Sequence, residues 1–164
     1  NLAIALAQSG NSVLLVDCDM RKPSIHKKFK ISNAAGTAEL LLRKKLFEEV
    51  ANKYNENLTI ITAGKIPPNP SEMLASRAMT AFIEEMKKEF KYIILDTPPL
   101  QAVTDAQVLS TKADGVLLVV RAGSTKREMV FNSVDLIKKV QGKVIGTVLN
   151  GVENKKNNYY YYGE

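Results

Sequence analysis

Cysteine, histidine and long apolar runs are scarce or missing in this sequence. Its only cysteine, Cys18, has no disulfide partner within the given chain, which is compatible with a reducing, cytoplasmic setting. Cys18 and the single histidine, His26, are too few to hold a zinc ion. No apolar stretch approaches the roughly 18 residues that a membrane-spanning helix needs. The sequence therefore predicts a cytoplasmic globular domain that depends on its apolar core.

Acidic residues are missing from one strongly basic stretch. The chain of 164 residues has a net charge of +6, and its segment 21–30 contains five Lys or Arg and no acid. This stretch is either a solvated face or a surface that attracts anions such as phosphates, acidic tails or lipid headgroups. The length and the hydrophobic content of 45% fit one domain with a full core.

Hydrophobic runs alternate with helix-like segments along the chain, without hairpin signals. This order predicts an α/β fold, a mostly parallel β-sheet flanked by helices on both faces. We expect one domain over residues 1–150 and a flexible tail over 151–164. The expected strands are 13–17, 58–62, 92–96, 116–120 and 143–149, and the expected helices are 1–8, 37–43, 46–54, 70–89, 105–112 and 126–140.

Two of the expected strands end in aspartate. The run from Val13 ends at Asp17, with Asp19 two residues further on, and the run from Tyr92 ends at Asp96. Ligands of parallel sheets bind beyond the carboxyl ends of the strands, and carboxylates there suit a magnesium ion that bridges nucleotide phosphates. A spare carboxylate can accept a proton from an attacking hydroxyl. The three aspartates therefore predict a magnesium–nucleotide site.

A glycine-rich phosphate-binding loop is missing beside these aspartates. The nine glycines never form Gly-x-x-x-x-Gly-Lys-Ser/Thr. The chain opens at Asn1 inside a helix-like segment, where the helix after such a loop would stand. We expect that the given sequence is truncated at its N-terminus and lacks the first strand and the phosphate-binding loop (P-loop). Without them, this fragment alone should not turn over ATP.

Several motifs resemble those of one enzyme family. Residues 14–23 (LLVDCDMRKP) resemble the Walker A′ motif of the bacterial tyrosine kinases of capsule and exopolysaccharide synthesis, which are P-loop relatives of the MinD and ParA ATPases. Residues 93–99 (IILDTPP) resemble their Walker B motif. Segments 63–74 (AGKIPPNPSEML), 103–106 (VTDA) and 146–150 (GTVLN) match in order and spacing. The resemblance covers essentially the whole chain.

The resemblance implies ATP and Mg²⁺ as cofactors and a role for each acid. Asp17 would orient or deprotonate the acceptor hydroxyl and share the magnesium ion, which Asp19 and Asp96 would also hold, Asp96 through water. The division of roles between Asp17 and Asp19 stays open. Three further residues are expected at the nucleotide: Arg21, Thr97 and Asn150. Arg21 alternatively carries an exposed loop charge, and Asn150 alternatively belongs to a turn.

Four adjacent tyrosines stand near the C-terminus: Tyr159, Tyr160, Tyr161 and Tyr162. The resemblance implies that a neighbouring copy of the kinase phosphorylates them in trans. Segment 151–164 carries two Glu and two Lys, so its side-chain charge is zero. Each phosphotyrosine would add roughly −1.5 to −2 charges. Phosphorylation would then repel a tail that is docked in the acidic site of a neighbour.

The resemblance also implies three kinds of partner. A Wzz/CapA-like membrane adaptor would activate the kinase through its cytoplasmic tail at the inner face of the membrane. Other copies of the chain would form a ring-shaped homo-oligomer, and polysaccharide-synthesis enzymes would be substrates. The resemblance implies no nucleic acid. Two alternatives remain. A MinD/ParA-like positioning or partition ATPase would share the acid-ended strands but needs no tyrosine tail. A non-enzymatic phosphoacceptor module would leave the aspartates unexplained.

Overall fold

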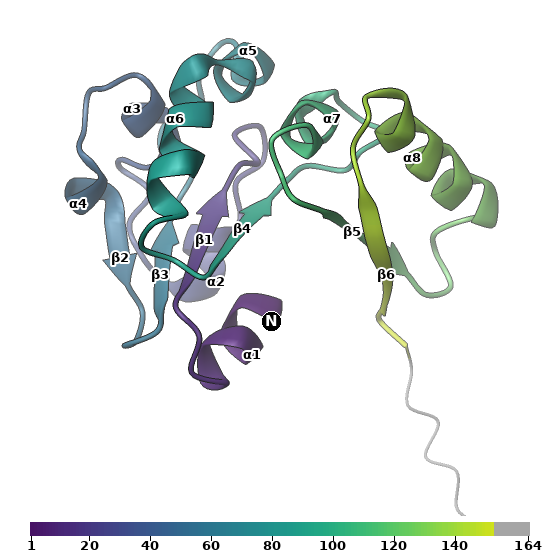
Figure 1. Cartoon of the computed structure of the whole chain (residues 1–164), viewed down its shortest axis with the longest axis horizontal. Coiled ribbons are helices and arrows are strands. Elements are labelled where there is room, and N and C mark those ends of the chain that lie inside the picture. The colour runs from purple at the N-terminus through teal and green to yellow at the C-terminus, as the bar shows by residue number, and fades with distance from the viewer. Residues whose placement is uncertain (153–164) are drawn as a thin grey trace, which may run out of the picture.

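The computed structural model describes residues 1–152, which form a four-stranded and a two-stranded β-sheet with helices around them (Figure 1). The larger sheet has its strands in the order β2-β3-β1-β4, and the smaller sheet pairs β5 with β6. The strands are β1 (Val13–Asp17), β2 (Ala51–Lys53), β3 (Leu58–Ile61), β4 (Tyr92–Asp96), β5 (Val116–Arg121) and β6 (Val144–Asn150). The helices are α1 (Leu2–Gln8), α2 (Ile25–Phe29), α3 (Thr37–Leu41), α4 (Phe47–Val50), α5 (Pro70–Ala75), α6 (Arg77–Met86), α7 (Asp105–Ser110) and α8 (Arg127–Lys139).

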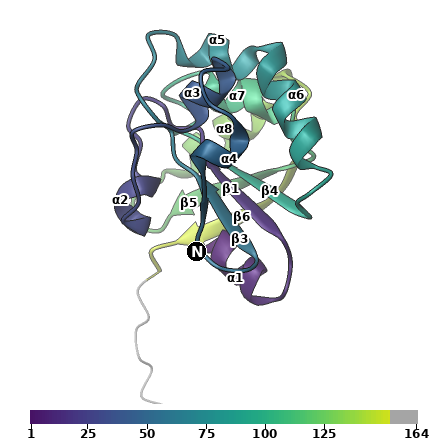
Figure 2. The same cartoon turned by 90° about the vertical axis from the view of Figure 1, so that its left-hand side faces the viewer.

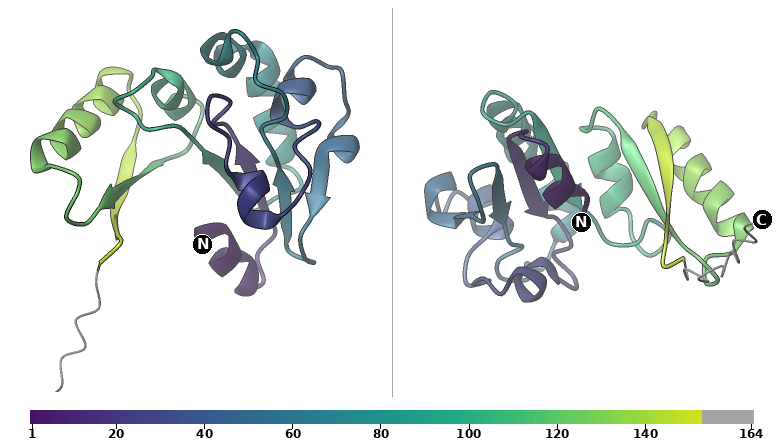
Figure 3. Two further views of the ribbon diagram at one scale, coloured as in Figure 1. Left: turned by 180° about the vertical axis from the view of Figure 1, so that it is seen from behind. Right: turned by 90° about the horizontal axis from the view of Figure 1, so that it is seen from below.

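Strand β1 lies at the centre of the larger sheet and is buried along its whole length. It pairs in parallel with β3 on one side and with β4 on the other. Because side chains alternate along a strand, Val13 and Leu15 pack against α1 and α2, whereas Leu14 and Val16 face the core beneath α3, α5 and α6. Figures 2 and 3 show α2 on the opposite face of the sheet from α6. The predicted α/β architecture with helices on both faces is confirmed.

The burial of β4 and β5 differs from what their apolar runs predict. Tyr92 is exposed at the start of β4, and Val119 is exposed on β5; on β6, Ile145 is exposed as well. Among the described residues, β4 pairs only with β1, and β5 only with β6. Each of these two strands therefore has one edge and part of one face that no described residue covers.

Two of the expected helices are wrong in part. The segment 70–89 is divided at Ser76, whose extended backbone ends α5 and begins α6. The Ser76 hydroxyl donates to the carbonyl of Met73 and accepts from the N–H of Met79, so it satisfies backbone groups of both helices. The segment 46–54 is helical only as far as Val50, after which β2 pairs antiparallel with β3. The antiparallel edge strand and the short helix α2 are not predicted from the sequence.

The start of α3 packs closely against the end of β3. The N–H of Thr37 donates to the carbonyl of Thr62 at 2.7 Å. At Gly36, the residue before α3, a Cβ atom would collide with the same carbonyl oxygen and approach the Gly64 nitrogen to 2.6 Å. A side chain could change its rotamer to make space, but these are backbone atoms, so the position has no room for a methyl group.

We predict that Gly36→Ala lowers the free energy of unfolding by about 2 kcal/mol or more, because the backbone must shift to admit the methyl group. The matched control is Gly146→Ala, whose Cβ would meet the Leu117 side chain at an ordinary 3.4 Å. The control should change stability by less than about 0.5 kcal/mol. Urea unfolding of both variants measures the difference, and equal stabilities would contradict the packing at α3.

Candidate active site

Asp17 closes β1 as a fully buried carboxylate. Its Oδ1 accepts the N–H of Asp19 at 3.1 Å, and its Oδ2 accepts the N–H of Ile25, the first residue of α2, at 3.2 Å. The Thr37 hydroxyl donates to the backbone carbonyl of Asp17 at 3.0 Å. The side chain and the backbone of Asp17 are therefore both fastened to the elements that follow β1.

Asp19 lies in the loop after β1 and is half-buried. Its Oδ1 accepts the N–H of Arg21 at 3.2 Å and the N–H of Lys22 at 2.9 Å. Because β1 ends at Asp17, the alternation of side chains along a strand does not reach Asp19. The turn, held by carboxylates that accept backbone N–H groups, determines where Asp19 lies.

Asp96 closes β4 directly beside Asp17. The two residues are partners in the parallel register of β1 and β4. The N–H of Cys18 donates to the carbonyl of Asp96 at 2.8 Å, so the pairing continues one residue past the end of β1. Unlike Asp17, Asp96 is exposed to solvent. The fold thus places acids from two neighbouring strands at the same end of the sheet, as the sequence predicts.

The pKa values of Asp17 and Asp96 are both raised above their ordinary values. Burial raises the pKa of Asp17 to about 6; the hydrogen bond from Ile25 opposes this shift, and the charges of Asp96 and Asp19 add to it. Burial also raises the pKa of Asp96, whereas the charge of Lys28 lowers it and that of Asp19 raises it. A concentration of negative charge with hard oxygen donors suits a divalent cation.

The three carboxylates do not form a ready-made three-ligand metal site. Within residues 1–152, no group of three or more His, Cys, Asp or Glu side chains is close enough to hold an ion. Both oxygens of Asp17 and one oxygen of Asp19 already accept backbone N–H groups. The predicted magnesium site at Asp17, Asp19 and Asp96 stays a prediction. A magnesium ion here would depend on one or two of them, with phosphate and water oxygens completing its shell.

The guanidinium of Arg21 binds Asp105 and makes no hydrogen bond to Asp17, Asp19 or Asp96. Its Nε donates to Oδ2 of Asp105 at 2.9 Å, and an Nη donates to Oδ1 at 3.1 Å. Asp105 is fully buried at the first position of α7. The sequence indicates that Asp105 starts a helix and belongs to a family motif, but nothing in it identifies Asp105 as the partner of Arg21.

Of the remaining predicted site residues, one lies next to Asp96, one lies in the smaller sheet, and four lie outside the described residues. Thr97 follows Asp96 and is half-buried. Asn150 ends β6 in the smaller sheet, where its side chain accepts the N–H of Gly151, and no hydrogen bond among residues 1–152 connects it with the acids. The four predicted acceptor tyrosines, Tyr159, Tyr160, Tyr161 and Tyr162, lie outside the described residues.

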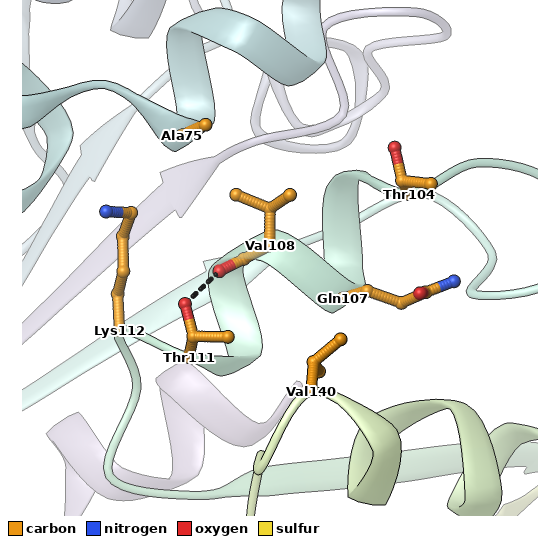
Figure 4. A pocket seen from close by; sticks show the side chains of 7 residues that line it. All are labelled: Ala75, Thr104, Gln107, Val108, Thr111, Lys112 and Val140. Atoms are coloured by element: carbon orange, nitrogen blue, oxygen red, sulfur yellow. Dashed lines mark hydrogen bonds between the residues drawn. The ribbon is translucent and has the colours of Figure 1, made fainter.

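A shallow pocket of about 380 Å³ lies against α7 (Figure 4). Thr104, Gln107, Thr111 and Lys112 contribute its polar groups. No carboxylate lines it, and the Lys112 amine already donates to the hydroxyl of Thr80 at 2.6 Å. This pocket is therefore separate from the candidate active site.

Comparison with known proteins identifies the class and then the family. A family model described as "AAA domain" matches residues 1–149. A plasmid partition protein from Borrelia burgdorferi has a similar fold, with a TM-score of 0.72 at 19% identity over 94% of this chain and 74% of that one. With the acid-ended parallel strands, these matches define an α/β protein with the MinD/ParA-like P-loop NTPase fold.

The chain belongs to the bacterial tyrosine-protein kinases. It is 39% identical to tyrosine-protein kinase YwqD of Bacillus subtilis, over 99% of this chain and 70% of the relative. It is also 39% identical to the putative tyrosine-protein kinase CapB of Staphylococcus aureus, over 100% and 73%. The kinase domain of Escherichia coli tyrosine kinase ETK matches with a TM-score of 0.90 at 34% identity, over 99% of this chain and 64% of that one.

The raised pKa of Asp17 predicts a specific pH dependence of stability. The folded chain binds the proton with a pKa of about 6, against an ordinary value of 3.8. The stability from this group is therefore fully present below pH 4 and is lost as the pH rises through 6. In full-length protein without magnesium, we expect the free energy of unfolding relative to Asp17→Asn to fall by about 2–3 kcal/mol between pH 4 and pH 8. Parallel stability curves for the two proteins would contradict this assignment.

Proposed function

We propose that this chain is the catalytic part of an ATP-dependent protein-tyrosine autokinase that regulates capsular or exopolysaccharide synthesis. The proposal depends chiefly on the meeting of Asp17, Asp19 and Asp96 at the ends of β1 and β4. The family membership adds support, because the relatives that match over nearly the whole chain are named tyrosine-protein kinases.

In the proposed reaction, the tyrosine hydroxyl oxygen forms a bond to the γ-phosphorus of ATP as the bond to the β–γ bridging oxygen breaks, and ADP leaves. The phenol has an ordinary pKa near 10, so its proton needs an acceptor at neutral pH. Asp17 suits this role because its pKa of about 6 lies close to neutrality. To reach the hydroxyl, Asp17 must exchange one of its hydrogen bonds to Asp19 or Ile25.

Asp19 and Asp96 are the proposed magnesium ligands, because each has carboxylate oxygen not taken up by backbone N–H groups. When bound, magnesium would neutralise charge on the phosphates. The β- and γ-phosphates also need a cradle of backbone N–H groups. Arg21, Thr97 and Asn150 are retained as proposed nucleotide contacts, Arg21 only if its guanidinium leaves Asp105.

The proposed acceptors are Tyr159, Tyr160, Tyr161 and Tyr162 of a neighbouring copy, which requires the chain to self-associate. Residues 1–152 contain no helix that is both long and apolar enough to cross a membrane. We propose that the cytoplasmic tail of a Wzz/CapA-like membrane adaptor recruits and activates the kinase, with polysaccharide-synthesis enzymes as further substrates. A partition-type ATPase is the second candidate, supported by the fold likeness to the plasmid partition protein alone.

Intact-mass spectrometry tests the kinase directly. The gene product, with whatever sequence its gene places before Asn1, is incubated with ATP and Mg²⁺, with and without adaptor tail. We expect successive additions of about 80 Da, one per phosphoryl group, that map to Tyr159–Tyr162. Asp17→Asn should slow them by about 10²- to 10⁴-fold, because the proton acceptor is lost.

The matched control replaces all four tyrosines with phenylalanine. This variant should lose the mass steps in the tail and still phosphorylate the tail of an added catalytically impaired copy. ATP hydrolysis without tyrosine modification, even with adaptor present, would contradict the kinase and favour the partition-type ATPase.

A further inference from the structure

Asp105 is a fully buried carboxylate that lies away from the three acids of the candidate active site. Arg21 grips it at two points, through Nε at 2.9 Å and through Nη at 3.1 Å. The Ser71 hydroxyl also donates to Asp105 and accepts an N–H of Arg21 at 3.0 Å. These three side chains come from the loop after β1, the first turn of α5 and the start of α7. We refer to them as the Arg21 cluster.

The Arg21 cluster keeps Asp105 ionised and its arginine in a fixed position. Burial raises the pKa of Asp105, but the hydrogen bonds from Arg21 and Ser71 and the charge of Arg21 outweigh it, so the pKa stays below its ordinary value. A two-point arginine–carboxylate contact is stronger and more directional than a single hydrogen bond. Removing the charge of Arg21 would leave the buried carboxylate of Asp105 without compensation. The guanidinium is therefore fixed in place although its side chain is 39% exposed.

The backbone of Arg21 carries this restraint to the active site. The same residue whose guanidinium binds Asp105 donates its N–H to the carboxylate of Asp19. Asp105 in turn follows the loop that leaves β4 after Asp96. The Arg21 cluster thus joins the loops that follow both acid-bearing strands, and Figure 1 shows the loop after β1 beside α7.

We propose that Arg21, Asp105 and Ser71 form a positioning cluster that fixes the loop of Asp19 at the ends of β1 and β4. This inference rests on the proposed kinase function of the same site. Arg21 is a positioning residue here, because it acts through Asp19 and its guanidinium is directed at Asp105. A displacement of about 1 Å in a reacting group can cost roughly 10²-fold in rate, so loss of the cluster should slow phosphoryl transfer more than it weakens ATP binding.

The test uses the full-length gene product and four variants: Arg21→Ala, Arg21→Lys, Asp105→Asn, and the double variant Arg21→Ala/Asp105→Asn. We expect kcat for tyrosine phosphorylation to fall about 10- to 100-fold in Arg21→Ala and Asp105→Asn, with KM for ATP changed less than about twofold. The double variant should be no slower than the slower single variant, since both changes break the same contact. Arg21→Lys keeps the charge without the two-point grip and should lie between.

Two matched controls remove the same side chains elsewhere. Arg77→Ala removes an exposed arginine that makes no side-chain hydrogen bond among residues 1–152, and Asp114→Asn changes a carboxylate whose side chain is 91% exposed. Both should retain the kcat of the unsubstituted protein. Thermal unfolding of every variant separates a general loss of folding from a local effect.

Hydrogen exchange of the nucleotide-free protein gives a readout that does not depend on activity. In Arg21→Ala and Asp105→Asn, the amides of the loop 19–25 should exchange at least about tenfold faster, because fixing the guanidinium protects the N–H groups bonded to Asp17 and Asp19. Exchange in β1 and β3 should be unchanged. Ser71→Ala is the mildest change and should raise the exchange rate of the same amides by a smaller factor. This variant keeps the test usable if the variants of Arg21 and Asp105 unfold.

Three results would overturn the proposal. Unchanged loop exchange in Asp105→Asn would show that the cluster does not restrain the loop. A large rise in KM for ATP in Arg21→Ala, absent in Asp105→Asn, would make Arg21 a nucleotide ligand instead. If the fall in kcat of the double variant equals the product of the falls in the two single variants, Arg21 and Asp105 do not act through the same contact. If the unsubstituted protein phosphorylates no tyrosine, the proposed function fails, and the exchange measurement still decides whether the cluster positions the loop.

Discussion

The burial of the Asp17 carboxylate at the end of β1 is the constraint on which the rest of the site depends. A buried carboxylate needs hydrogen-bond donors, and both of its oxygens find them in backbone N–H groups of the following loop and of α2. This requirement ties the loop to the strand. Thr37, bonded to the carbonyl of Asp17, extends the same restraint to α3. The buried strand β1 thereby fixes the position of the loop and the helices that follow it.

The same arrangement separates two kinds of charge. Asp17 and Asp96 meet at the ends of neighbouring strands, and burial together with neighbouring negative charge raises the pKa of both carboxylates. Asp105 instead has its charge matched by Arg21 and serves the structure around the site. Of these three aspartates, only Asp105 is paired with an arginine, and this pairing distinguishes it from the other two.

Local patterns predicted much of this fold. The run from Val13 to Asp17 and the run from Tyr92 to Asp96 form strands with the predicted bounds, and their acids meet in register. The division at Ser76 escaped prediction because the apolar spacing of 70–89 is helical on both sides, and a single serine hydroxyl decides the break. The strand β2 escaped it because three residues carry too little periodicity, and their pairing with β3 alone makes them a strand.

The sequence by itself determined the strands, the acids at their ends and the family, because hydrophobic alternation and short motifs are local properties of the chain. Only the tertiary structure decided which partner each charge has. Arg21 lies 84 residues from Asp105 in the chain, and no spacing rule connects them. The fold brings them together because β1 and β4 are parallel neighbours, so that the loops leaving both strands emerge at one end of the sheet, where a buried carboxylate must find a cation.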